Sequence, residues 1–206
     1  MSDTLFPTAS LDGLRRETRA QAVFLPALAP FAPQHWPLVG LLPVLDINGA
    51  LAAALASRAP FRTSPPIAGI FATDPFLRLA DLAETLRRAA VTQVINYPTV
   101  QLYDGETTAA LASVGYRAEA EFRLLLRLAE RGFAPIACVT SRDAADLALA
   151  LGLRRMVLHP GLGARARPAA WWAELAGHVA IEGGEPLRWR EPAVGQVSRP
   201  SRRIRL

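Results

Sequence analysis

IACVTSRDAADLALAL, residues 136–151, is the stretch that decides the fold. Its first four residues form an apolar run typical of a buried β-strand, and the alanine- and leucine-rich residues 144–151 predict a helix. Thr140 or Ser141 stands between them, where a hydroxyl can cap the start of the helix. The stretch therefore predicts a strand followed by a helix, with polar side chains at the carboxyl end of the strand.

The same order of elements recurs along the chain. Five more apolar runs lead into a polar residue: residues 39–45 into Asp46, 67–71 into Thr73 and Asp74, 93–95 into Asn96, 156–158 into His159, and 179–181 into Glu182. We also expect a first strand at 22–28, the second over the whole of 38–45, the seventh at 178–181 and an edge strand at 187–189. The predicted fold is an α/β, TIM-barrel-like repeat of parallel strands, incomplete, with about six or seven β/α units.

Length and composition indicate one domain. The chain has 206 residues, of which 51% are hydrophobic and 20% charged, enough for one substantial core. We expect a single domain over residues 11–190, with flexible termini at 1–10 and 191–206. An eightfold β/α barrel usually takes roughly 250 residues, so this chain is expected to lack some units or to complete its core with a partner.

The basic charge is concentrated in one segment. The formal net charge is +5, but Arg199, Arg202, Arg203 and Arg205 lie within the last eight positions, and residues 1–198 hold 19 basic against 18 acidic groups. The body is therefore nearly neutral, and no nucleic-acid partner is expected. No signal-like start and no clean apolar span is found, so we expect no membrane partner and a cytoplasmic location.

Two residue types limit the chemistry. The chain contains no lysine, which excludes a Schiff-base lysine and a P-loop lysine. Cys138 is the one cysteine and lies within the apolar run 136–139, so we expect a buried, inert thiol.

Several short motifs keep their order and spacing over residues 38–163. They are found at residues 41–48, 68–70, 73–76, 96–100, 104–105, 115–121 and 159–162. Together these motifs resemble the phosphoenolpyruvate hydrolase-like family of TIM barrels, which is similar to the phosphoenolpyruvate mutase and isocitrate lyase group. The glycine-rich first unit and the glycine-rich loop after the histidine strand have no counterpart here, so the resemblance implies a barrel shortened at both ends.

The resemblance also implies a chemistry. It points to a metal-dependent lyase or hydrolase acting on a small phosphoenolpyruvate- or α-keto-acid-like carboxylate through an enolate, with Mg²⁺ or Mn²⁺ as Lewis acid. The expected metal ligands are Asp46 and Asp74. The expected catalytic residues are His159, Asp74 and Asn96, and the expected substrate-binding residues are Thr73, Tyr97, Thr99, Glu119 and Gly161.

Most of these residues also have a purely structural interpretation. Asp46 can form a turn with the following Asn48 and Gly49, and Thr73 or Asp74 can cap the next helix. His159 is expected to titrate near neutrality as an acid or base, unless hydrogen bonds fix it as a structural histidine.

The two glutamates of residues 115–121 cannot both face a site. Glu119 and Glu121 point about 200° apart on one helix. We expect Glu119 to be the inward one, because Phe122 and Leu126 share its side. Asn96 and Tyr97 could orient an enolate or carboxylate oxygen as neutral donors.

A second hypothesis comes from another class of protein. A barrel that lacks units could have lost catalysis and act as a subunit or interaction module, with a symmetric partner supplying the missing strands. The expected partners are therefore a small carboxylate substrate and either a second copy of the chain or a partner subunit.

Overall fold

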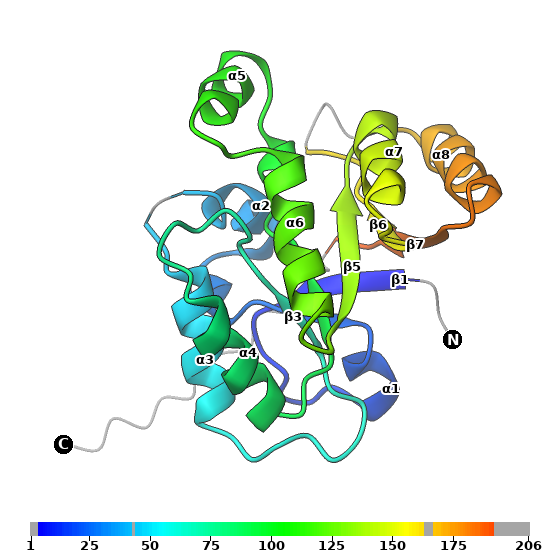
Figure 1. Ribbon diagram of the computed structural model, residues 1–206. Helices are drawn as coiled ribbons and strands as arrows, with labels where there is room; N and C mark the ends of the chain where they lie inside the picture. The colour runs from blue at the N-terminus through cyan, green and yellow to red at the C-terminus, as the bar shows by residue number, and fades with distance from the viewer. Residues whose placement is uncertain (1–3, 43, 163–166, 192–206) are drawn as a thin grey trace.

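Seven parallel strands close into a barrel in the computed structural model, which describes residues 4–42, 44–162 and 167–191 (Figure 1). The ring follows the chain order, and β7 pairs with β1 to complete it. The strands are β1 (Thr4–Thr8), β2 (Ala22–Phe24), β3 (Ile67–Gly69), β4 (Gln93–Ile95), β5 (Ala134–Val139), β6 (Arg155–Leu158) and β7 (Glu185–Trp189). The predicted α/β, TIM-barrel-like class is confirmed.

Helices connect the strands and cover the outside of the ring, as in other β/α barrels. The α-helices are α1 (Arg16–Arg19), α2 (Trp36–Val39), α3 (Ile47–Ala56), α4 (Leu79–Arg88), α5 (Gly105–Ser113), α6 (Ala118–Ala129), α7 (Arg142–Ala150) and α8 (Ala169–Ile181). Short 3-10 turns occur at Pro26–Leu28, Pro33–His35 and Val100–Leu102. Ser141 caps α7 by accepting a hydrogen bond from the Ala144 N–H, as predicted.

The ring is closed where the sequence predicted gaps. Thr4–Thr8, expected as part of a flexible terminus, forms β1, and Glu185–Trp189 pairs with both β6 and β1 instead of lying at an edge. The barrel therefore needs no strands from a partner, which corrects that part of the second hypothesis. Seven strands instead of eight are enough for this chain to close its sheet.

Two predicted strands are wrong. Residues 178–181 are the last turn of α8, because that apolar run continues a helix that began at Ala169 and ends before Gly183. The described residues of the predicted strand 38–45, namely 38–42 and 44–45, hold the end of α2 and a turn instead of a strand, since Pro37 occupies the first turn of α2 and fixes its backbone angle for a helix.

Alternating side chains divide the core into two layers. One cluster fills the inside of the barrel and includes Val23, Ile95, Ile136 and Val157, all buried. The other packs the outer face of the strands against the helices, and Phe122 of α6 is fully buried in it. Within residues 4–42, 44–162 and 167–191, no helix is long and apolar enough to cross a membrane.

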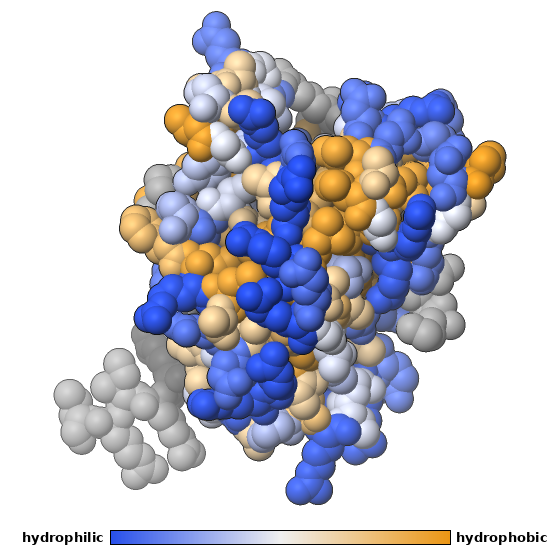
Figure 2. Space-filling model, viewed as in Figure 1, coloured by the Kyte–Doolittle hydropathy of each residue, from blue (hydrophilic) through white to orange (hydrophobic). Residues whose placement is uncertain are grey.

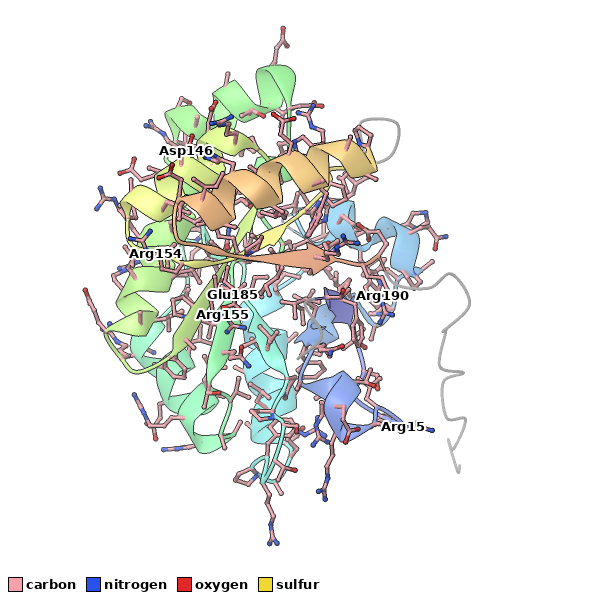
Figure 3. The ribbon with its side chains drawn as sticks, turned by 90° about the vertical axis from the view of Figure 1, so that its right-hand side faces the viewer. Arg15, Asp146, Arg154, Arg155, Glu185 and Arg190 are labelled. Carbon is pink, nitrogen blue, oxygen red and sulfur yellow. The ribbon has the colours of Figure 1, made fainter. Side chains whose placement is uncertain are left out.

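The two ends of the barrel differ in chemistry. At the amino ends of the strands, Arg155 donates to Gln93 at 2.8 Å and to Glu185 at 3.1 Å (Figure 3). Arg190 lies at the opposite end of β7, where its guanidinium lies over the Phe6 ring. Asn96 and His159 directly follow the carboxyl ends of β4 and β6, as predicted, whereas Glu182 follows α8.

Candidate active site at the carboxyl ends of the strands

An aromatic cluster fills the carboxyl end of the barrel interior. It consists of Tyr97 after β4, His159 after β6 and Trp189 at the end of β7. The ring centroid of Tyr97 lies 5.7 Å from that of His159 and 4.5 Å from that of Trp189, and the His159 and Trp189 centroids are 5.3 Å apart. Three elements far apart in the sequence thus place their rings together because their strands are parallel and end at one mouth.

His159 presents one ring nitrogen to this cluster. Its Nδ1 accepts a hydrogen bond from the Gly161 N–H at 3.1 Å, so a neutral ring carries its proton on Nε2. That Nε2 is buried and has no hydrogen-bond partner among the described residues. Gly161, predicted to bind substrate, is therefore placed to fix the tautomer of His159, and its φ of 92° is one that favours glycine.

The expectation that His159 titrates near neutrality is wrong. Burial lowers the pKa of its imidazole from 6.5 to about 3, because an imidazolium in the barrel interior would lose its hydration. The ring is therefore neutral at physiological pH. Its Nε2–H is suited to donating a hydrogen bond and not to acting as a proton-carrying acid or base.

Tyr97 adds a second neutral donor. Its hydroxyl is buried and has no hydrogen-bond partner within the part of the chain that the structure describes. Burial raises the pKa of this phenol well above 10, and the charge of Glu191 raises it further. Buried polar groups without partners cost about 1–3 kcal/mol each, so two of them in one aromatic cluster mark this mouth as a candidate site.

Glu191 lies next to the cluster. Its Oε1 is 3.6 Å from His159 Nε2, beyond hydrogen-bond distance, and it accepts from Trp189 Nε1 at 3.2 Å. Burial raises the pKa of this carboxyl above 4.5, with the Trp189 hydrogen bond acting in the opposite direction. The side chain is 49% exposed, so Glu191 can exchange protons with solvent while it faces the buried rings.

The sequence reasoning missed Glu191 and Trp189. Both belong to the carboxyl end of β7, and the predicted seventh strand was placed at 178–181, where α8 lies. The available signal was the alternation of residues 185–189, which was given only to an edge strand. Because the ring is closed, β7 is not an edge strand, and the residues at its carboxyl end belong to the mouth of the barrel.

Glu121, and not Glu119, is the inward-facing glutamate. Glu119 lies on the outside of α6 and pairs with Arg123 at 2.6 Å, so the expectation that it faces inward is wrong. Glu121 is fully buried, because it shares the inner side of α6 with Leu125 and Leu128. The prediction used only two apolar neighbours, Phe122 and Leu126. Two residues were too few to determine which side of the helix faces the core.

Four donors surround the Glu121 carboxylate. It accepts hydrogen bonds from Asn96 Nδ2 at 2.9 Å, Thr99 Oγ1 at 2.7 Å, Val100 N at 2.9 Å and Gln101 Nε2 at 3.0 Å. Burial nevertheless raises the pKa of Glu121 to about 7, and the four hydrogen bonds only partly offset that effect. Glu121 therefore ties the loop after β4 to α6.

Asn96 and Thr99 are occupied by this network. Asn96 Oδ1 accepts from the Cys138 N–H at 2.7 Å, and its Nδ2 donates to the Cys138 carbonyl at 3.3 Å as well as to Glu121. The amide thus continues the pairing of β4 with β5 beyond Ile95. Asn96 and Thr99 keep the loop in place, and Cys138 is buried as predicted.

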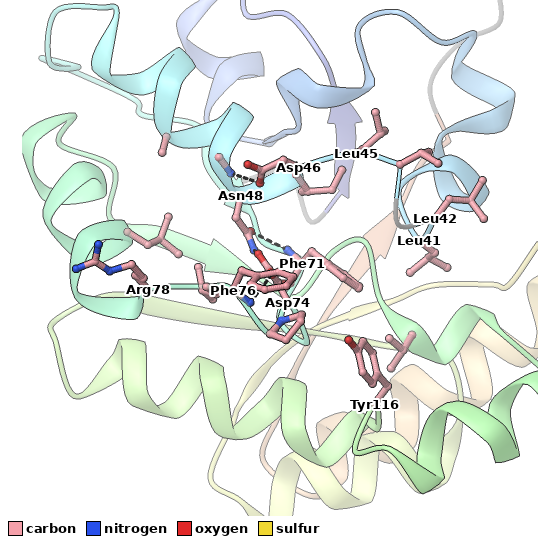
Figure 4. Close-up of a pocket in the computed structure, with 18 of the residues that line it drawn as sticks. Leu41, Leu42, Leu45, Asp46, Asn48, Phe71, Asp74, Phe76, Arg78 and Tyr116 are labelled. Carbon is pink, nitrogen blue, oxygen red and sulfur yellow. Dashed lines mark hydrogen bonds between the residues drawn. The ribbon is translucent and has the colours of Figure 1, made fainter.

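The predicted aspartates lie in a different place, an open groove of about 880 Å³ (Figure 4). It is formed by the segments after β2, β3 and β4, together with α5 and Tyr116, which precedes α6. Asp46 Oδ1 caps α3 by accepting from the Gly49 N–H. Asp74 accepts from the Phe76 N–H at 2.8 Å and from Asn48 Nδ2 at 2.9 Å. The structural interpretation of Asp46 is therefore realised. The expectation that Thr73 or Asp74 caps the next helix is wrong, because Asp74 caps a turn and α4 begins after Arg78.

The groove and the barrel mouth do not share their key residues. Asp46 and Asp74 line the groove, whereas His159, Asn96 and Tyr97 are not among its lining residues. Thr73 stands beside Asp74, with its Oγ1 buried and without a hydrogen-bond partner among the described residues. All of these residues follow the carboxyl ends of strands, but the groove opens outward between helices while the ring cluster is inside the barrel.

The donor set of the groove does not fit a divalent cation well. Among the residues the structure describes, no group of three His, Cys, Asp or Glu side chains is placed to hold a metal ion. Asp46 and Asp74 each accept hydrogen bonds from backbone or amide donors, whereas Mg²⁺ would need those oxygens itself. The two aspartates therefore serve as turn and helix caps in this structure.

Fold and site together define a class: a closed parallel β/α barrel with its polar cluster at the carboxyl ends of the strands. The chain belongs to the phosphoenolpyruvate hydrolase-like family. The sequence model of that family matches residues 35–175, more than half of the sequence.

Two kinds of relatives share part of the sequence. The uncharacterized protein y4oT of Sinorhizobium fredii is 37% identical over 117 residues, which are 57% of this chain and 59% of that protein. The tomato (Solanum lycopersicum) ToMV resistance protein Tm-1(GCR237) and ToMV susceptible protein tm-1(GCR26) are each 29% identical over 126 residues, which are 61% of this chain and 17% of theirs. The similarity thus spans less than two thirds of each of these relatives.

Proposed function

We propose that the protein is a lyase- or hydrolase-type barrel enzyme that binds a small carboxylate, of the phosphoenolpyruvate or α-keto-acid kind, at the mouth formed by Tyr97, His159 and Glu191. The observation that carries the proposal is the pair of buried donors without partners, Tyr97 O–H and His159 Nε2–H. The family match supports the substrate class.

The two donors would hold an oxyanion. Negative charge develops on the keto oxygen when a bond next to the carbonyl breaks and an enolate forms. Neutral donors that are already fixed in a dry site stabilise such charge without reorganising. His159 is fixed by Gly161 and by its burial, so its Nε2–H is available without a change of tautomer.

Glu191 would carry the proton. Its raised pKa and its position 3.6 Å from His159 Nε2 place a carboxyl that can gain and lose a proton beside the proposed oxyanion position. This assignment moves the proton transfer from His159, where the sequence placed it, to Glu191. Trp189 would cover one side of the substrate and exclude water.

A substrate screen tests the proposal. Phosphoenolpyruvate and several α-keto, β-keto and 2-hydroxy acids are incubated with the full chain, with and without Mg²⁺ or Mn²⁺, and product formation is followed. Tyr97→Phe, His159→Phe and Glu191→Gln should each lower kcat about 100-fold. Tyr103→Phe is the matched control, because its hydroxyl donates to the Leu41 carbonyl in the groove and its loss should leave the rate unchanged.

Two outcomes would contradict the proposal. Wild-type rates in all three variants would show that the mouth is not the active site. The absence of turnover with every acid tested would contradict the proposed enzymatic function. Metal dependence is read from the same screen combined with Asp74→Asn. If turnover requires Mg²⁺ or Mn²⁺ and Asp74→Asn abolishes that turnover, the reaction takes place in the groove and not at the mouth.

A further inference from the structure

The groove of about 880 Å³ is mostly apolar and open to solvent. Three large side chains along it are unusually exposed for their type: Leu42 is 47%, Val44 69% and Phe76 89% exposed. Figure 2 shows apolar surface on this side of the molecule. It lies between the pair of helices α3 and α4 on one side and α5 on the other. An exposed apolar groove of this kind marks a surface that something covers.

The charged groups of the groove have one sign in excess. Asp46, Asp74 and Asp81 line it together with a single cation, Arg78. Arg78 is paired with Asp81 at 3.1 Å, so Asp46 and Asp74 are left as carboxylates without a cationic partner among the lining residues. The rest of the chain is not acidic, since its formal net charge is +5. The groove therefore suits an occupant with apolar side chains and positive charge.

Residues 192–206 of this chain have that composition. They contain four arginines, at 199, 202, 203 and 205, and four aliphatic side chains, at Val194, Val197, Ile204 and Leu206. They contain no acidic residue. Both features complement the groove, and the proposed function makes no use of them.

The segment also starts within reach of the groove. Glu191 follows β7 at the carboxyl end of the barrel, the same end from which the segments after β2 and β3 build the groove. In the ring, β7 is next to β1, and β1 is next to β2, with neighbouring strands about 4.8 Å apart. The fifteen residues 192–206 can span up to about 50 Å when extended, which exceeds that separation severalfold.

We propose that residues 192–206 bind in the groove of their own chain. The aliphatic side chains lie against Val44 and Phe76, and arginines pair with Asp46 and Asp74. The occupant is thus a segment of the same molecule, held by burial of apolar surface and by charge complementarity. The proposal is independent of the enzyme assignment, because it uses neither Tyr97, His159 nor Glu191.

Site-specific photo-crosslinking of the full chain tests the proposal. Cys138 is buried, so a Ser201→Cys variant can be labelled with a benzophenone maleimide at that position, and the unsubstituted chain serves as the labelling control. After irradiation, mass spectrometry locates the crosslinks. We expect them in residues 41–49 and 71–85. A mixture of ¹⁵N-labelled and unlabelled chains should give crosslinks within one chain only.

Two variants show whether the groove and its charges cause the contact. Val44→Arg combined with Phe76→Arg should lower the crosslink yield in the groove about tenfold, as should Arg202→Glu combined with Arg203→Glu. Ile181→Arg is the matched control, because Ile181 is equally apolar and 84% exposed on α8; it should not change the yield.

Three results would overturn the proposal. Crosslinks scattered over other surfaces, or none at all, would show that the segment does not bind in the groove. Crosslinks between labelled and unlabelled chains would show that a second copy fills it. A yield that the charge reversals at 202 and 203 leave unchanged would remove charge complementarity as the cause.

Discussion

Replacing His159 by phenylalanine should change how the stability of the protein depends on pH. In the unfolded chain this imidazole takes up a proton below its ordinary pKa of 6.5, whereas in the folded chain burial lowers the pKa to about 3. Between these two values the unfolded chain binds the proton and the folded chain does not. Acid therefore favours unfolding, and the loss of stability begins as the pH falls below 6.5.

The size of the effect follows from the two pKa values. At pH 7.5 the unfolded imidazole is almost fully neutral, so the contribution is close to zero. At pH 5 the wild-type protein should lose about 2 kcal/mol through this one group. The phenylalanine variant has no such group, so its free energy of unfolding relative to wild type should shift by about 2 kcal/mol in its favour between pH 7.5 and pH 5.

Urea unfolding followed by circular dichroism at the two pH values measures this shift. The comparison between pH values cancels any difference in packing between the two rings, since that difference is the same at both. Tyr97→Phe is the control, because the pKa of Tyr97 is raised above 10 and its loss should not alter the pH dependence in this range. Parallel curves for His159→Phe and wild type would refute the reasoning.

Four further changes have defined outcomes. Glu121→Gln removes a group whose stabilising protonation is complete below its ordinary pKa of 4.5 and is lost as the pH rises through about 7. Its unfolding free energy relative to wild type should therefore shift by about 2.5 kcal/mol in favour of the variant from pH 5 to pH 8, and a constant difference would contradict this. Asn96→Ala should cost about 2–4 kcal/mol in urea unfolding at pH 7, because it leaves the buried Cys138 N–H without its acceptor and removes one donor to the Glu121 carboxylate; a cost under about 1 kcal/mol would not fit. Phe122→Ala should lower stability by about 3–5 kcal/mol, against less than about 0.5 kcal/mol for Val114→Ala, which is 68% exposed; equal effects would argue against the buried position of Phe122. In a pH profile of turnover, the acidic limb should have a midpoint above 4.5 and be absent in Glu191→Gln, and an unchanged limb would exclude Glu191 as the proton carrier.

The strands that the sequence predicted well are those with an apolar run and clear flanking signals. Gln93–Ile95 agrees at both ends, and β5 and β6 differ from prediction by two residues or fewer at each end. The strand predicted at 178–181 failed because a short apolar run looks the same in a helix and in a strand. β1 was missed because five residues that include Pro7 carry almost no local signal, and closure of the ring depends on a partner far along the chain.

The site was predicted in position better than in role. His159, Asn96 and Tyr97 do follow strand ends, because that depends only on the order of elements. Their chemistry depends on burial, which a single sequence does not report: burial makes His159 a neutral donor and commits Asn96 to the backbone of Cys138. The exchange of Glu119 for Glu121 has the same origin, since two positions on one helix differ only in what packs against them.

Pairing of β1 with β7 has a consequence for synthesis of the chain on the ribosome. The first strand leaves the exit tunnel before the other six, but its neighbour on one side, Arg188 and Trp189, is made only after the five strands between them. Until then the nascent sheet has an open edge that can pair with other chains. We therefore expect newly made, unfinished chains to need protection by chaperones, and truncations before residue 185 to aggregate instead of accumulating as smaller folded proteins.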